Sequence, residues 1–321
     1  MNSVFYLIYA FLLFVAYLIY FTLARKYQIV DHPNHRTMHE DATIRGGGIV
    51  LFLAMAFCSL FLPDTGLYFL AGITIVGLTG FLDDLYNLSG KVRFPLQLLS
   101  IVCILAELQL FGIGLLLLFV VIIVATGTLN AYNFMDGING MTAGYSVVIV
   151  LSLIYVNNSE FFFISNDFLI YFLVALSVFS FFNFRNKARC FAGDVGSLTI
   201  AFIVVYLIIK LIQTSHQYGF ILFLTLYGMD TIFTIIQRII RKENIFDAHR
   251  LHLFQVIVSK TKMPHLSMSI IYMIIQVVIN LIILVLIKNP IVNQLIYITI
   301  MLIVFSIVYI ILKRKMMFKS F

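Results

Sequence analysis

The stretch GIGLLLLFVVIIVATGTLNAYNFMDGINGMTAG, residues 112–144, joins a long apolar run to an abrupt polar end. Residues 112–129 carry no charge and approach the ~20 residues that a helix needs to cross a bilayer. Three asparagines and one aspartate then follow at intervals of three, and a second apolar run begins at about residue 139. Amides and a carboxylate are costly at the edge of a membrane helix, so we expect them to have a use.

Apolar runs separated by polar segments recur along the whole chain. Of 321 residues, 62% are hydrophobic and 11% are charged, and the mean hydropathy is +1.05. We therefore predict an all-α, polytopic membrane protein that forms one integral-membrane domain over residues 1–321. No cleavable signal-peptide pattern precedes the first apolar run, which is expected to be retained as a span. The eleven expected spans are 4–24, 46–62, 67–82, 94–110, 112–129, 139–156, 168–184, 195–212, 220–236, 268–287 and 291–312.

The basic residues orient these spans. With the N-terminus outside, 19 of the 21 Lys and Arg residues fall in the inner connections, as the positive-inside rule requires. Ten of the fourteen Asp and Glu residues fall on the same side, which that rule does not explain. We therefore expect an outer N-terminus, an inner C-terminus and an active site that faces the cytoplasm. The three cysteines have no paired spacing, so neither a disulfide nor a zinc site is expected.

Five polar clusters lie on the predicted inner side. The first ends in three glycines, whose amide N–H groups at a helix start would favour an anion; close helix packing is the alternative. The last contains two histidines three residues apart, without the further ligands that a zinc site needs. Positive-inside bias is the alternative for the basic residues. The basic and imidazole groups predicted to bind substrate phosphates are Arg36, His39, Arg45, Lys91, Arg93, Arg189, His249, Arg250 and His252.

Carboxylates in these clusters are suitable ligands for Mg²⁺. Asp83 and Asp84 are adjacent, and on a helix they would point about 100° apart, which predicts different roles. Asp194 lies between two glycines at the start of an apolar span, where helix N-capping is the alternative. Asp230 lies within an apolar run and is a candidate substrate-binding residue, with pairing to a basic neighbour as the alternative.

Asn130, Asn133 and Asp136 would lie along one side of a helix end. Such a strip could present amides and a carboxylate to a nucleoside base or a sugar hydroxyl, whereas turn formation accounts only for the Asp-Gly and Asn-Gly pairs. Together the clusters predict Mg²⁺-assisted phosphoryl transfer between a soluble nucleotide-linked group and a lipid acceptor.

Four motifs also carry a resemblance to a known family. LDDLYNLSGKVR, NAYNFMDGINGMTAG, FAGDVGSL and FDAHRLH occur in this order, separated by predicted spans. In this respect the chain resembles the polyprenyl-phosphate N-acetylhexosamine-1-phosphate transferases, or glycosyltransferase family 4. The resemblance covers the chain from about Asp31 to His252.

The resemblance implies a transferase of the bacterial inner membrane. It would transfer a sugar-1-phosphate from a UDP-N-acetylhexosamine derivative to undecaprenyl phosphate, release UMP and require Mg²⁺, with Mn²⁺ as an alternative. Asp83, Asp84 and Asp194 would then be catalytic, and Asp194, Asp84 and Asp136 would be the metal ligands. The Asn133 and Asp136 pair would contact the nucleotide or the metal site.

The last motif also bears on the branch of the family. It has fewer histidines than the peptidoglycan-initiating branch, and the form of the motifs is closer to transferases that begin O-antigen, capsule or teichoic-type glycans. Modified N-acetylhexosamines such as FucNAc, QuiNAc or a diamino sugar are the expected donors. The prenyl chain length, the choice between direct attack and an aspartyl-phosphate, and the oligomeric state remain open, with a homodimer as one alternative. No nucleic-acid partner is expected. The rival function is a secondary transporter of an anionic solute, but we find no matched halves in the hydropathy pattern.

Overall fold

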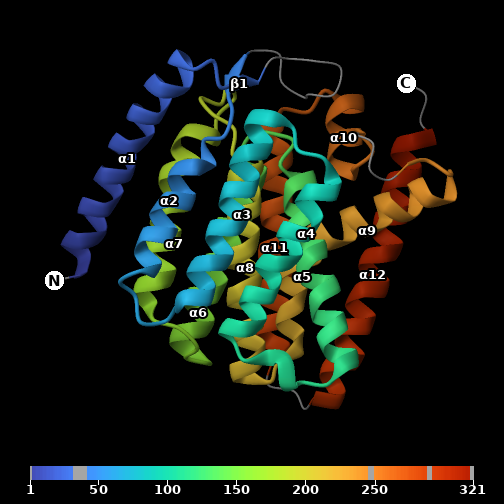
Figure 1. Ribbon diagram of the computed structural model, residues 1–321. Coiled ribbons are helices and arrows are strands. Elements are labelled where there is room, and N and C mark those ends of the chain that lie inside the picture. Colours follow the sequence, from blue (N-terminus) through green and yellow to red (C-terminus); the bar gives the residue numbers. More distant parts are fainter. Residues whose placement is uncertain (1, 32–41, 245–248, 288–290, 319–321) are drawn as a thin grey trace.

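The computed structural model describes residues 2–31, 42–244, 249–287 and 291–318, and within these ranges nearly all regular structure is helical (Figure 1). Two short 3₁₀ helices, η1 (Leu110–Gly112) and η2 (Tyr218–Leu224), and one two-stranded sheet, β1 (Val30–Asp31) with β2 (Thr43–Ile44), complete the described structure. The α-helices are α1 (Asn2–Lys26), α2 (Gly48–Ser59), α3 (Leu67–Tyr86), α4 (Gly90–Glu107), α5 (Leu115–Met135), α6 (Met141–Ser159), α7 (Asn166–Asn183), α8 (Gly193–Ser215), α9 (Thr225–Ile240), α10 (Leu253–Thr261), α11 (His265–Leu286) and α12 (Ile291–Phe318).

The predicted all-α membrane class is confirmed. Ten of the eleven expected spans each overlap one α-helix, and the span 220–236 covers parts of η2 and α9. In the described ranges nine segments are long and apolar enough to cross a bilayer. The other two are α2, which has only 12 residues, and α4, which begins with two basic residues and contains Pro95. A count of eleven complete spans therefore stays a prediction. The amphipathic α10 was not expected.

Helix α8 forms the centre of the bundle. Fifteen of its 23 residues are buried, because α2, α3 and α5 pack around it. The helices approach closely where both lack side chains: a Cβ added to Gly48 of α2 would lie 2.0 Å from the Cα of Gly196. Small residues allow such contacts between membrane helices. This packing brings the N-terminal end of α8 against the ends of α2 and α3.

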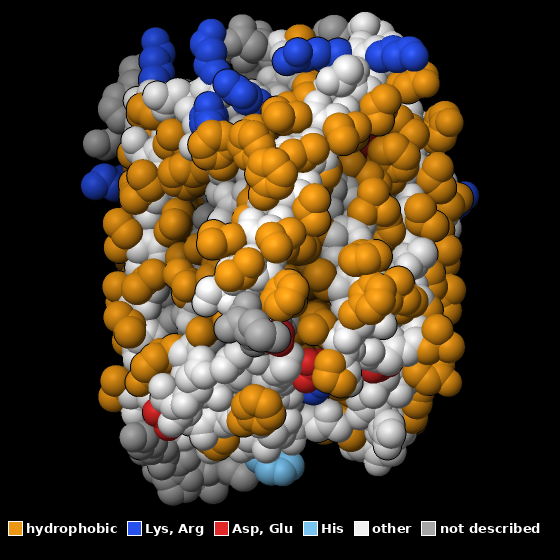
Figure 2. Space-filling model, turned by 90° about the vertical axis from the view of Figure 1, so that its left-hand side faces the viewer, with side chains coloured by type: hydrophobic (Ala, Val, Ile, Leu, Met, Phe, Trp, Pro, Cys, Tyr) orange, Lys and Arg blue, Asp and Glu red, His pale blue; other side chains and the backbone are white. Residues whose placement is uncertain are grey.

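The connections rich in polar residues gather at one end of the bundle. There β1 and β2 pair in antiparallel register, and Ile44 forms an isolated parallel bridge with Cys190, just before α8. The sheet, α10 and the C-terminal end of α12 lie at this same end (Figure 1). Figure 2 shows most of the visible Lys and Arg side chains along this edge, above a surface dominated by hydrophobic side chains.

Candidate active site

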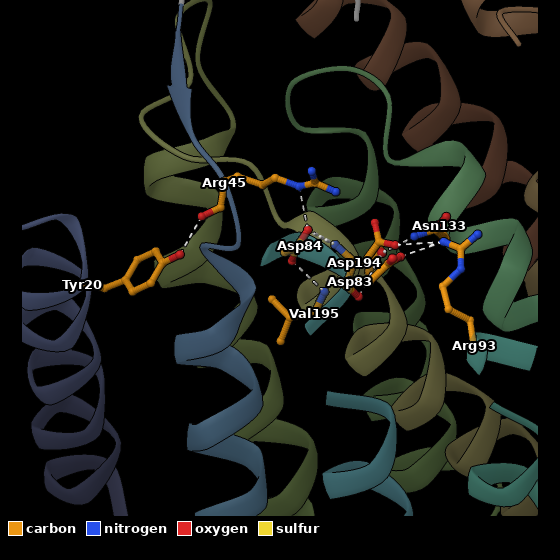
Figure 3. A network of polar contacts seen from close by, with 9 residues as sticks. Tyr20, Arg45, Asp83, Asp84, Arg93, Asn133, Asp194 and Val195 are labelled. Carbon is orange, nitrogen blue, oxygen red and sulfur yellow. Dashed lines mark hydrogen bonds and ion pairs between the residues drawn. The ribbon is translucent and has the colours of Figure 1, made fainter. Parts of the chain in front are cut away.

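Three aspartates from two helices meet at the polar end of the bundle (Figure 3). Asp83 and Asp84 lie in the last turn of α3, and Asp194 lies in the first turn of α8. The Nη1 atom of Arg93, near the start of α4, lies 2.7 Å from Asp83 Oδ2 and 3.3 Å from Asp194 Oδ2. A single guanidinium therefore bridges two carboxylates that are 111 positions apart in the chain.

Asp84 faces away from this bridge, as the helical geometry predicted. Its Oδ1 accepts hydrogen bonds from Arg45 Nε at 2.8 Å and from the Asp194 amide at 3.0 Å, and its Oδ2 accepts from the Val195 amide at 3.1 Å. The Asp84 side chain is completely buried. It thus satisfies amides at the start of α8, where a negative charge is favourable.

This arrangement overturns the N-cap alternative for Asp194. The N-cap position of α8 is Ala192, which provides no side-chain hydrogen bond, while Asp194 lies inside the helix. The capping carboxylate comes from α3 instead. Gly193 precedes Asp194 with φ +69°, and a Cβ at this position would lie 2.3 Å from Asp84 Oδ2. Glycine is therefore required here both by the backbone conformation and by the close carboxylate.

Two of the three glycines of the first cluster do not offer free amides to an anion, so the expectation of anion binding is wrong for them. Gly47 donates its N–H to the Phe191 carbonyl at 2.8 Å, and Gly48 donates to the Ala192 carbonyl at 2.9 Å. These bonds attach the start of α2 to the loop before α8. The alternative reading, close packing, is confirmed for this segment.

A polar cavity of about 300 Å³ opens beside the aspartates. Of the predicted site residues, Arg45, Asn133, Asp136 and Asp194 line it. Although Asn139 and Ser197 lie in two of the quoted motifs, sequence reasoning did not select the other polar residues of the lining. These are Asp31, Asn139, Asn183, Ser197, Gln255 and His265.

The asparagine side chains at and just beyond the end of α5 have different hydrogen-bond partners. Asn133 Nδ2 lies 3.4 Å from Ser197 Oγ of α8, at the cavity. Asn130 Nδ2 instead donates to Gln97 Oε1 of α4 at 3.0 Å and to a carbonyl of its own helix. Asn139 Nδ2 donates to the carbonyls of residues 185 and 186 and so fixes the loop before α8. Asn133, Asp136 and Asn139 line the cavity, whereas Asn130 does not.

The cavity holds more negative charge than its own cations balance. Asp136, just beyond the end of α5, has its pKa raised to about 7 by burial and by the negative charge of Asp84. Burial opposes the charge of Arg45, yet the carboxylates of Asp84 and Asp194 outweigh this effect and raise its pKa. A cation bound near Asp136 would therefore be electrostatically favourable.

The donor set suits a magnesium ion that is shared with a substrate. Among the described residues, no group of three His, Cys, Asp or Glu side chains is placed to hold a metal ion. Mg²⁺ is nevertheless commonly held by one or two carboxylates together with substrate phosphates and water. Asp194 and Asp136 on the cavity wall match that requirement, whereas the oxygens of Asp84 are already occupied by three donors.

The remaining predicted residues lie away from the cavity. Lys91 and Arg189 are exposed, and Asp230 and His252 are buried beneath the start of α10. The rings of His249 and His252 lie 5.0 Å apart, which confirms that they face the same way. Burial lowers the pKa of His249 to about 4, so its imidazole is neutral at pH 7. Arg250 is half-buried beside His249, and Arg36 and His39 lie outside the described residues.

Comparison with known proteins agrees with the geometry. The sequence model described as Glycosyl transferase family 4 matches residues 66–212. A probable undecaprenyl-phosphate N-acetylglucosaminyl 1-phosphate transferase of Bacillus subtilis (strain 168) is 26% identical over 277 residues, covering 78% of this chain and 76% of that protein. Undecaprenyl-phosphate alpha-N-acetylglucosaminyl 1-phosphate transferases of Thermotoga maritima and Escherichia coli (strain K12) are 26% and 24% identical, over 74% and 73% of this chain and 77% and 70% of those proteins. The matched residues run from the start of α3 almost to the end of α8 and include Asp83, Asp84, Asn133 and Asp194. The part of the chain that is similar to glycosyl transferase family 4 therefore contributes the three clustered aspartates of the candidate active site.

Proposed function

We propose that this protein transfers a sugar-1-phosphate of the N-acetylhexosamine type from a UDP-sugar to undecaprenyl phosphate. UMP is released, and the lipid-linked sugar begins a glycan. The observation that carries this proposal is the bridge of Asp83 and Asp194 by Arg93 beside a polar cavity, at the basic end of an apolar bundle. The printed names of the relatives support the same reaction.

The charges around the cavity explain why a divalent cation belongs in this proposal. Among the described residues at this end of the bundle, the carboxyl groups of Asp31, Asp83, Asp84, Asp136 and Asp194 outnumber the guanidinium groups of Arg45 and Arg93 that pair with them or line the cavity, so the formal charge is negative before an anionic substrate arrives. A pyrophosphate would be repelled by this surplus. When bound by Asp194 and Asp136, Mg²⁺ would neutralise the charge that develops on the oxygen of the leaving UMP.

Different residues of this chain would bind the two substrates. Asp194, Asp136 and Asn133 line the cavity, which we assign to the nucleotide-sugar. Asp83 lies beside Asp194, is bound by the same Arg93 nitrogen, and is assigned to the phosphate of the lipid, as base or as nucleophile. Arg93 holds Asp83 and Asp194 together, so that both substrates are positioned against one another. Asp84 fixes the start of α8 and the side chain of Arg45.

The proposed donor class includes several sugars. The relatives' names specify N-acetylglucosaminyl transfer. The sparse histidines of the last motif favour instead a modified N-acetylhexosamine of the O-antigen and capsule type. The segment 238–267 is proposed to select among them, since it carries Gln255 and His265 to the cavity wall. Exchange of this segment with that of a GlcNAc-specific relative should shift the donor preference; an active chimaera with unchanged preference would exclude this role.

The reaction is tested by UMP release from purified protein. The protein in detergent is incubated with undecaprenyl phosphate and a panel of UDP-sugars, with Mg²⁺, with Mn²⁺ or with a chelator. We expect release to require both substrates and the metal, and to disappear in Asp194→Asn. The control is uptake of the same UDP-sugars into liposomes that contain the protein. Uptake without UMP release would refute the transferase and support the transporter.

A further inference from the structure

Asp230 forms a buried centre of hydrogen bonds outside the cavity. Its side chain lies in α9 and is 2% exposed. The Leu253 amide donates to its two oxygens at 2.9 and 3.1 Å, Tyr272 Oη donates to Oδ2 at 3.0 Å, and Tyr309 Oη donates to Oδ1 at 2.9 Å. Thr234 Oγ1 lies at 3.3 Å from Oδ1. One carboxylate thus joins α9 to α10, α11 and α12.

Two of these three partner helices carry residues of the cavity wall. Leu253 begins α10, and Gln255 lies two residues later on the cavity. His265 begins α11 and also lines the cavity, and Tyr272 follows two turns later on the same helix. The described side chains of the third partner helix, α12, contribute nothing to the cavity lining. Asp230 is therefore tied to two supports of the cavity and to one helix that has no direct part in it.

The side chain of Gln255 is itself held in a defined orientation. Its Oε1 accepts a hydrogen bond from the His252 amide at 3.3 Å, which completes a capping box at the start of α10. A Cβ added at Gly137, another residue of the cavity wall, would lie 3.3 Å from Gln255 Nε2. The amide group of Gln255 is thus directed toward the end of α5, beside Asp136. Its position depends on where α10 begins.

We infer that Asp230 is a positioning residue, which fixes α10 and α11 so that Gln255 and His265 form the wall for the nucleotide-sugar. This inference rests on the proposed function. A buried carboxylate that receives four donors holds them in one arrangement, whereas an asparagine in its place would turn an N–H₂ group toward some of them. The start of α10 would then shift, although no atom of Asp230 lines the cavity.

Kinetics with two substrates separate positioning from general support. Asp230→Asn should raise the KM for UDP-N-acetylglucosamine about 10-fold or more, within the roughly 10²-fold that a displacement of about 1 Å can cost. The KM for undecaprenyl phosphate should stay within about two-fold of the wild type, because the ion-pair partners of Arg93 are Asp83 and Asp194, in α3 and α8, rather than residues of α10. Equal changes in both KM values, or no change in either, would overturn the inference.

Two tyrosines provide a matched control. Tyr272→Phe and Tyr309→Phe each remove one hydroxyl bond of nearly equal length to Asp230, and Tyr309→Phe also removes the contacts of its hydroxyl with Thr234 and Lys313. Only Tyr272 lies on a helix that carries a cavity residue. We expect Tyr272→Phe to raise the KM for the UDP-sugar and Tyr309→Phe to leave it unchanged, even where both lower the Tm. The same effect from both variants would mean that Asp230 only supports the bundle. This pair also decides the question where Asp230→Asn fails to fold.

Hydrogen exchange provides a readout that does not depend on activity. In Asp230→Asn, the amides of 251–265 should exchange at least several-fold faster, while those of α3 and the first turn of α8 should be unchanged. Exchange of α10 at the wild-type rate would refute the positioning role. If the wild-type protein releases no UMP from any UDP-sugar, the proposed function fails, and faster exchange would still establish that Asp230 holds the cavity wall.

Discussion

The Asp194→Asn and Asp84→Asn variants form a pair that separates catalysis from scaffolding within one cluster. Asp194 pairs with Arg93, whose side chain is 36% exposed, and an ion pair of this kind contributes about 0–1 kcal/mol to stability. An asparagine at position 194 retains an oxygen for Arg93 and leaves the capping of α8 to Asp84. The folded state should therefore lose about 1 kcal/mol at most.

The catalytic effect of Asp194→Asn should be much larger than its effect on folding. The proposed metal needs an ionised carboxylate, and removal of one group that stabilises transition-state charge costs about 10²- to 10³-fold in kcat, or about 2.7–4 kcal/mol. We expect a loss of at least about 10²-fold in the rate of UMP release at saturating Mg²⁺.

Asp84→Asn should affect folding stability more than Asp194→Asn does. The three donors around Asp84 leave no place for the N–H₂ group of an asparagine, and Arg45 would lose its partner. Breaking a buried ion pair costs about 3–5 kcal/mol, and since Arg45 is 28% exposed, we expect about 3 kcal/mol. The Tm should fall by roughly 5 °C or more.

The assay combines UMP release with thermal unfolding in the same detergent. The reasoning would be refuted if Asp194→Asn kept most of the wild-type rate, in which case Asp136 would become the leading metal ligand. It would also be refuted if Asp194→Asn lowered the Tm as much as Asp84→Asn does.

Four further predictions concern the acceptor, the backbone, pH and topology. Asp83→Asn should reduce turnover by about 10²-fold while calorimetric binding of the UDP-sugar stays within two-fold. Gly193→Ala should prevent stable folding, because its Cβ would lie 2.3 Å from a carboxylate oxygen, whereas Gly90→Ala, with nothing within 4 Å, should keep the wild-type Tm. Because the pKa of His249 is about 4 in the folded protein against an ordinary 6.5, the unfolded chain binds this proton more tightly, so stability present above pH 6.5 should fall toward pH 4, and His249→Gln should reduce that fall in a series of Tm measurements. A cysteine at the exposed Lys315 should react with an impermeant maleimide only from the cytoplasmic side; labelling from the outside alone would reverse the predicted orientation.

Part of the candidate site followed from helical geometry alone. The different directions of Asp83 and Asp84 were predictable, because consecutive residues on a helix point about 100° apart. The nearness of Asp194 to this pair was expected from the resemblance and from the shared inner side of the membrane. Their connection through Arg93 was not, since the residues of a cluster can be assigned to an end of the bundle without indicating which side chains pair.

Some roles required knowledge of which helices are neighbours. From the sequence, Asp194 was a candidate N-cap of the helix that it begins. In the structure Asp84 accepts the amide hydrogen bonds at the start of α8, because the packing of α3 on α8 places its carboxylate there. The three glycines are equally compatible with anion binding and with packing, and only the structure shows that the carbonyls of Phe191 and Ala192 occupy the amides of Gly47 and Gly48. Lys313 belongs to the basic C-terminal segment, yet only the packing of α12 on α9 shows that it is buried and donates to Thr234 and Tyr309.

The sequence by itself determined that the chain lies in a membrane, that its fold is all-α, and at which end of the molecule the polar residues lie. These properties depend on apolar length and on charge summed along the chain, and both are local quantities. Only the tertiary structure decided that Asn133 and Asp136 face the cavity while Asn130 contacts α4, and that Gln255 and His265 complete the wall. Such roles depend on which helices lie side by side, and that choice is made by close packing between segments far apart in the chain.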